Sequence, residues 1–171
     1  MQLSDLSQPP LVALSKLIGL LSLPNLTDVV CNGPDLWFAD VGNGLRRLPN
    51  LSVSDSELLA LARTLVDLGD RHLDIANPIT DVSLHPKRLI NVRGFQGLFD
   101  PLVKAGIERL RVHAVLESAV SATTLLSLRV HRTQAFRLDK LADSGGWSPA
   151  QLDAVKAIAH ARRNVLVSGP A

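Results

Sequence analysis

Cysteine is nearly absent from this 171-residue chain, which contains only Cys31. A single cysteine excludes an internal disulfide and a four-cysteine zinc site. Because Cys31 adjoins an apolar run, it is more typical of a small core residue than of a nucleophile. The five histidines are scattered and show neither the H-E-x-x-H pattern nor the paired spacing of zinc ligands. We therefore expect no metal site in this chain.

Long hydrophobic runs are also missing. The most apolar early stretch, residues 11–23, contains Lys16 and ends before Pro24, so it falls short of the roughly 20 residues that a membrane-spanning helix requires. Asp5 stands where a signal peptide would carry basic residues, and no small-residue cleavage site follows. We expect no transmembrane segment and no targeting segment, and a cytosolic compartment is the simplest interpretation.

Aromatic residues make up only 4% of the chain, whereas apolar residues make up 46% and charged residues 20%. These values are typical of a globular protein and differ from those of a disordered chain. The length favours one domain, or one small domain plus part of a second.

The charge is distributed unevenly along the chain. Residues 1–86 hold five Lys/Arg against ten Asp/Glu, residues 87–137 hold nine against three, and residues 138–171 hold four against three. The basic block can attract the phosphates of nucleotide, nucleic acid or lipid, and the alternative is a solvated face. Only three phenylalanines interleave with its positive charges, which argues against a nucleic-acid-binding protein.

The first half of the chain predicts a helix, a three-stranded meander and a second helix. An apolar-periodic run follows Pro9 and Pro10, as in a helix started by proline. Turn-forming residues separate three short β-favouring runs, which are 27–31, 36–40 and 45–48. Ser54 and Glu57 then form a capping-box pattern before leucines at helical spacing.

The second half of the chain predicts three more strands, followed by two helices and a final short strand. The strands are 80–84, 110–116 and 124–130, which makes about six in all, and 85–108 is expected to be a long connection with one helix. A short helix at 138–142 and a helix capped at Ser148 and ending near Arg162 should follow. A compact apolar strand then begins at Asn164.

A buried strand that ends in glycine is how a phosphate-binding loop begins, because successive backbone N–H groups then point at phosphate. Here Gly169, Pro170 and Ala171 would be the first three residues of the pattern G-x-x-x-x-G-K-[ST], with Ser168 before them. The lysine and hydroxyl of that pattern do not appear. An ordinary strand-to-loop ending is the alternative.

Several segments, in order, resemble the Flp/Tad-type pilus assembly (CpaF-like) ATPases of the type II/IV secretion ATPase superfamily. The matches cover about three quarters of the chain. They are T-D-V-V-C-N-G-P (27–34), L-W-F-A-D (36–40), R-H-L-D (71–74), N-P-I (77–79), R-V-H-A-V-L (111–116), L-R (128–129), 136–144 and N-V-L-V-S-G (164–169). In the family the strand at 80–84 meets the R-V-H-A-V strand through a tight turn, so residues 85–108 look like an insertion.

The resemblance implies an α+β fold with an antiparallel PAS-like sheet. It divides the chain into an amino-terminal domain, 1–135, and a linker with the truncated first helix and strand of a RecA-like P-loop domain, 136–171. In the full-length protein, ATP and Mg²⁺ would bind between these domains, whereas the fragment alone is expected to bind no cofactor and to be inactive. Arg111 and Arg129, with Arg132 third, are the candidates for phosphate contacts. Ser168, Gly169, Pro170 and Ala171 are the candidates for the loop.

The resemblance further implies partners and a location. A hexamer, the protein's own motor domain and inner-membrane secretion or pilus platform proteins are the expected partners, at the cytoplasmic side of the inner membrane. No nucleic acid partner is expected. Two alternatives stay open, namely a stand-alone PAS-like sensor or interaction module, and a nucleic-acid-binding protein that uses residues 87–137.

Overall fold

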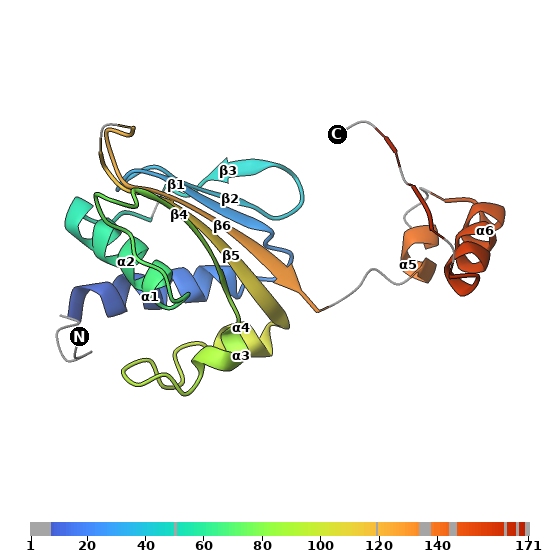
Figure 1. The fold of residues 1–171 in the computed structure, drawn as a ribbon, viewed down its shortest axis with the longest axis horizontal. Coiled ribbons are helices and arrows are strands. Elements are labelled where there is room, and N and C mark those ends of the chain that lie inside the picture. Colours follow the sequence, from blue (N-terminus) through green and yellow to red (C-terminus); the bar gives the residue numbers. More distant parts are fainter. Residues whose placement is uncertain are drawn as a thin grey trace. The chain divides into compact units, whose positions relative to one another are not determined.

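The computed structural model describes most of the chain, in two compact units. The units are Met1–Thr133 and Gln134–Ala171, and each is described by itself (Figure 1). The described residues are 8–49, 51–118, 120–133, 138–143, 147–162, 164–166 and 168–169.

The first unit is built on a six-stranded sheet in which every neighbouring pair is antiparallel. Its order is β3-β2-β1-β6-β5-β4. The strands are β1 (Asp28–Asn32), β2 (Trp37–Asp40), β3 (Leu45–Arg47), β4 (Ile79–Leu84), β5 (Ile107–Val115) and β6 (Leu125–Arg132). The α+β class, the meander and the six antiparallel strands are therefore confirmed.

One face of the sheet is covered by helices, and we call it the covered face. It carries buried side chains such as Val29, Val82, Val112 and Leu128. In the strands the intervening residues are exposed or half-buried, and they form the open face. Because successive side chains of a strand point to opposite faces, this alternation in burial follows directly from helices packing on one side only.

The covering layer consists chiefly of α1 (Gln8–Leu21) and α2 (Asp55–Asp67), which contact each other (Figure 1). Both bury leucines at helical spacing, including Leu14 and Leu17 of α1 and Leu58 and Leu61 of α2. Full burial of one leucine contributes about 1.5–3 kcal/mol, so this layer supplies much of the stability. Within the described residues, no helix is both long and apolar enough to cross a bilayer.

The capping box at the start of α2 is present as predicted. The Ser54 hydroxyl accepts the Glu57 backbone N–H at 3.2 Å, and the Glu57 carboxylate accepts the Ser54 backbone N–H at 2.8 Å. The hydrogen bonds from Ser54 to this carboxylate lower the pKa of Glu57. The helix therefore begins where two otherwise unpaired backbone donors find side-chain partners.

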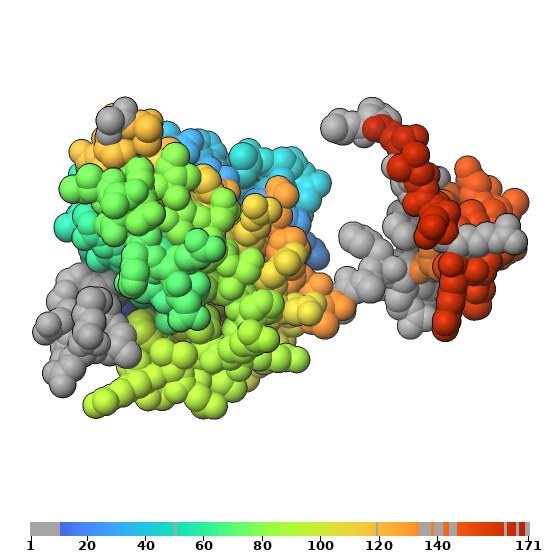
Figure 2. Space-filling view, in the orientation of Figure 1, coloured from blue at the N-terminus to red at the C-terminus, as the bar shows by residue number. Residues whose placement is uncertain are grey.

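The connection between β4 and β5 contains two short helices, where the sequence predicted one. They are α3 (Pro86–Leu89) and α4 (Asp100–Lys104), each with a proline in its first turn. Phe95 and Phe99 are buried between them, so the connection has its own apolar contacts. In Figure 2 this yellow-green segment forms the lower edge of the first unit. β5 also begins earlier than predicted, at Ile107.

The second unit contains α5 (Leu138–Asp143) and α6 (Pro149–His160). Ser148 and Gln151 form a capping box at the start of α6, and Leu152 is buried. The strand predicted from Asn164 does not form in the described residues 164–166 and 168–169. A strand needs a hydrogen-bonded neighbour, and the described part of this unit contains no other strand.

Gly69 should tolerate no side chain. A Cβ at this position would lie 2.6 Å from the Cβ of the buried Val82, whereas a Cβ at Gly19 in α1 would meet nothing within 4 Å. We expect Gly69→Ala to lower the free energy of unfolding by about 1–3 kcal/mol. Gly19→Ala should instead raise it by about 0.5–1 kcal/mol, since alanine favours helix. Urea unfolding of both variants measures this, and equal effects would contradict it.

Cys31 should be unreactive in the folded protein. Burial raises the pKa of its thiol to about 12, although a backbone hydrogen bond at Gly33 acts in the opposite direction. Because the thiolate is the nucleophile, a thiol reagent should label the native chain far more slowly than the chain in denaturant. Equal rates at neutral pH would show that the thiol is accessible.

Candidate functional site

Four adjacent strands place a row of polar side chains on the open face. The register pairs Ser83 of β4 with Arg111 of β5, Arg111 with Arg129 of β6, and Arg129 with Asp28 of β1. Directly opposite residues of antiparallel strands have Cβ atoms about 4.5–5.5 Å apart. Two arginines therefore stand side by side on an exposed surface, which costs free energy unless anions lie nearby.

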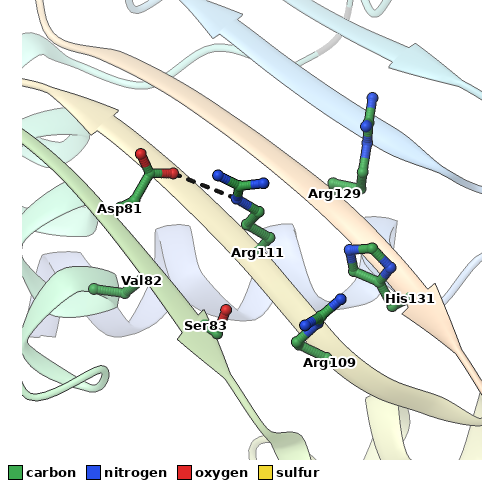
Figure 3. A pocket seen from close by; sticks show the side chains of 7 residues that line it. All are labelled: Asp81, Val82, Ser83, Arg109, Arg111, Arg129 and His131. Atoms are coloured by element: carbon green, nitrogen blue, oxygen red, sulfur yellow. Dashed lines mark ion pairs between the residues drawn. The ribbon is translucent and has the colours of Figure 1, made fainter.

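A second pair of cationic or titratable groups extends this row. Arg109 of β5 lies opposite His131 of β6, next to an irregularity in the β5 register. Together the two pairs and β4 enclose a shallow hollow of about 320 Å³, which we call the basic hollow (Figure 3). Its lining residues are Asp81, Val82, Ser83, Arg109, Arg111, Arg129 and His131.

Carboxylates on neighbouring strands hold the two central arginines. Arg129 donates through Nε to Asp28 Oδ1 at 2.8 Å, and Arg111 Nε lies 3.5 Å from Asp81 Oδ1. Asp81 also contacts His113, with 3.1 Å between Oδ2 and Nδ1. Both arginines use Nε for these contacts, and within the described chain their Nη groups have no hydrogen-bond partner. The planar end of each guanidinium thus remains available to an anion.

The electrostatics of the basic hollow act most clearly on His131. Burial lowers the pKa of His131, and the positive charges of Arg109, Arg129 and Arg111 lower it further, with only Asp28 acting in the opposite direction. The hydrogen bond to Asp28 raises the pKa of Arg129. At neutral pH the basic hollow therefore combines charged arginines with a neutral histidine.

Of the residues proposed from sequence, the structure brings Arg111 and Arg129 together but not Arg132. Arg132 follows the alternation to the covered side of β6. It donates from Nη1 to the Ala105 carbonyl and from Nη2 to the Leu23 carbonyl, each at 2.7 Å. Its guanidinium thus connects the end of α1 to the turn before β5.

The residues proposed for a phosphate loop belong to the second unit. Ser168 and Gly169 are exposed and lie outside any helix or strand. Pro170 and Ala171 fall outside the described residues.

Sequence reasoning missed Arg109 and His131 because it began one strand at Leu110 and ended the other at Val130. The signal was present in the alternation. Leu126, Leu128 and Val130 are the buried residues of β6, so every second residue, His131 included, faces the open side. The described residues contain no group of three or more His, Cys, Asp or Glu arranged to hold a metal ion.

Sequence comparison places the chain beside two mycobacterial proteins. It is 37% identical over 150 residues to a protein of Mycobacterium tuberculosis strain CDC 1551 / Oshkosh and, equally, to one of strain ATCC 25618 / H37Rv, each named "Putative conjugal transfer protein". The match covers 88% of this chain but 38% of each relative, so the chain spans well under half of their length. No protein-family model matches it.

Structure comparison finds the fold in a solved ATPase. The VirB11 ATPase from the type IV secretion system of Brucella suis, solved in complex with sulphate, matches with a TM-score of 0.54 and 16% identity. The match covers 90% of this chain and 44% of that structure's chain. At this identity the likeness shows a shared fold.

Replacing Arg132 should affect stability more than replacing Arg129. Arg132→Ala removes two hydrogen bonds from a guanidinium to backbone carbonyls, so we expect a loss of about 1.5–3 kcal/mol in the free energy of unfolding. Arg129→Ala removes one contact to Asp28 from an exposed surface, and such pairs contribute little. Urea unfolding of both variants compares them, and a larger loss for Arg129→Ala would contradict the assignment.

Proposed function

We propose that this chain is the amino-terminal part of a longer secretion ATPase of the type IV kind. In this proposal the first unit supplies arginines to the phosphates of ATP held by an adjoining motor domain. The observation that carries it is the facing pair Arg111 and Arg129 on the open face, with Arg109 beside them. Guanidinium stays charged at all relevant pH values and presents a planar set of donors to phosphate oxygens.

The comparisons support this class of protein. The mycobacterial relatives are named for conjugal transfer, and the structure with the shared fold is named as a type IV secretion ATPase in complex with sulphate. Sulfate resembles a phosphate group in charge and shape. The matched part is 38% of the relatives and 44% of the VirB11 chain, which supports a longer parent protein.

The basic hollow fits phosphate but not magnesium. Three arginines and one carboxylate line it, whereas Mg²⁺ needs oxygen ligands and takes few from nitrogen donors. In this proposal Mg²⁺ arrives with the nucleotide, and the motor domain holds it. The first unit then stabilises the charge on the phosphates, a role in which positioned cations contribute to phosphoryl transfer.

The second unit, in this proposal, is the linker and start of that RecA-like motor domain, with Ser168, Gly169, Pro170 and Ala171 in the phosphate loop. Exposed apolar side chains of this unit support a contact with further parts of the motor domain. Val165 is 56% exposed and Leu166 is 94% exposed, and Ile158 of α6 is 45% exposed. Apolar side chains gathered at one place on a surface mark a contact with more protein.

The assembly and the branch of the family are also proposals. A hexamer that contacts inner-membrane platform proteins from the cytoplasmic side would couple ATP hydrolysis to transport. The sequence motifs favour the Flp/Tad pilus branch, whereas the names of the relatives favour conjugal transfer and type IV secretion. An ATPase of the type II/IV secretion superfamily is common to both interpretations.

A nucleic-acid-binding surface is less well supported. Asp28 and Asp81 stand among the arginines, so the cations form a compact cluster and not a continuous basic stripe that could follow a phosphodiester backbone. The cluster instead matches a small polyanion.

Removing either central arginine should impair the full-length ATPase. We expect Arg111→Ala and Arg129→Ala each to lower kcat by about 10²-fold or more, as loss of a transition-state donor does. Arg46→Ala, which removes the same charge from β3 opposite Ala39 of the covered face, is the matched control and should keep the wild-type rate. Steady-state ATP hydrolysis measures all three.

Two outcomes would contradict the proposal. Wild-type rates for both Arg111→Ala and Arg129→Ala would remove them as phosphate ligands. Tight binding of the protein to duplex DNA, with a steep salt dependence that both variants reduce, would favour the nucleic-acid interpretation instead.

A further inference from the structure

His131 lines the basic hollow and has no part in the function proposed above. It lies opposite Arg109 across the β5–β6 pair, and its ring lines the hollow together with Arg111 and Arg129 (Figure 3). Three arginines thus surround a group that can itself gain a positive charge.

The charged groups in and beside the hollow that His131 lines come from four strands. Arg109 and Arg111 lie on β5, Arg129 lies on its own strand β6, Asp28 lies on β1 and Asp81 on β4. Asp28 is engaged by Arg129, and Asp81 by Arg111 and His113. The carboxylates are therefore already used by other cations, and the net field at the imidazole is positive. A proton on His131 is disfavoured in the free protein for this reason.

We propose that His131 is an additional ligand of the basic hollow, and that it takes up a proton when a divalent oxyanion, such as a phosphate group of a nucleotide, enters. This inference rests on the proposed function, because it assigns the anion to the same hollow. An anion with two negative charges cancels the repulsion from the arginines. The protonated imidazole then donates a charge-assisted hydrogen bond to it.

Because binding of the anion is coupled to uptake of a proton by His131, the direction in which the anion affinity changes with pH is fixed. The bound anion raises the pKa of His131, whereas the free protein holds it below its ordinary value. Between these two pKa values, binding takes up a proton, so the affinity is highest on the acid side. It falls as the pH rises through the pKa of His131 in the bound state. Above that pKa, His131 is neutral in both states and adds nothing to the pH dependence.

Sulfate is the probe that isolates this effect. Unlike phosphate, sulfate keeps both charges across the relevant range, so any pH dependence of its binding comes from the protein. We would follow the histidine ring protons of the 171-residue chain by NMR from about pH 5.5 to about pH 8.5, a range that spans the ordinary histidine pKa of about 6.5. Sodium chloride at equal ionic strength replaces sulfate in the reference titration.

The expected result is specific to one residue. Sulfate should raise the pKa of His131 relative to chloride, while the ring-proton signals of His72 and His160, which do not line the basic hollow, should not respond to sulfate. The sulfate affinity should fall by about tenfold from the acid to the alkaline end, which corresponds to a difference of about 1.4 kcal/mol. His131→Asn assigns the resonance and should remove most of this pH dependence, whereas His72→Asn, the matched control, should keep it.

The outcomes separate this inference from the proposed function. If sulfate shifts the backbone amides at 109–111 and 129–131 but leaves the pKa of His131 as in chloride, the phosphate site stands and the role of His131 is overturned. If sulfate shifts neither these amides nor the pKa of His131, both the phosphate site and the role of His131 are overturned. The same holds if Arg111→Ala and Arg129→Ala do not weaken the binding of sulfate. In the full-length protein, ATP and inorganic tripolyphosphate should reproduce the sulfate effect, and its absence with both would overturn the assignment to nucleotide phosphates.

Discussion

The pairing of β5 with β6 is the constraint on which both the core and the candidate site depend. Its register sets Val112 opposite Leu128 on the covered face and Arg111 opposite Arg129 on the open face. Because side chains alternate along a strand, a slip of one residue would turn the apolar set outward and bring the arginines against α1 and α2. The free energy gained by burying Val112 and Leu128 therefore also fixes the position of the two cations.

That arrangement places two positive charges next to each other. Carboxylates on the strands at either side reduce the repulsion between them. Asp28 on β1 and Asp81 on β4 stand on the two strands that flank the β5–β6 pair, and each engages the arginine nearer to it. Of the two carboxylates only Asp81 lines the hollow, where three arginines outnumber it, so the carboxylates reduce the repulsion without neutralising the hollow. An entering anion can then complete a charge balance that the protein leaves incomplete.

Much of the fold could be predicted from local patterns, because those patterns coincide with the tertiary structure. The Ser54–Glu57 capping box and the turns between β1, β2 and β3 are set by residues close in sequence. The candidate site depends instead on register between distant strands. Arg109 and His131 lay one residue beyond the predicted strand limits at Leu110 and Val130, and strand limits are what local patterns define least well. Of the two helices between β4 and β5 the sequence predicted only one, because α3 and α4 have four and five residues and are too short to show a clear helical repeat.

Arg129 and Arg132 show that the face of the strand on which a residue lies decides its role more than its residue type does. Both are arginines of β6, and the sequence alone made both candidates for phosphate. An odd separation puts them on opposite faces. On the covered side Arg132 donates hydrogen bonds to the backbone carbonyls of Leu23 and Ala105. On the open side Arg129 meets one carboxylate and solvent. The same chemical group therefore serves structure at one position and is available to a ligand three residues away, and any family-based transfer of an arginine's role must first establish which face it occupies.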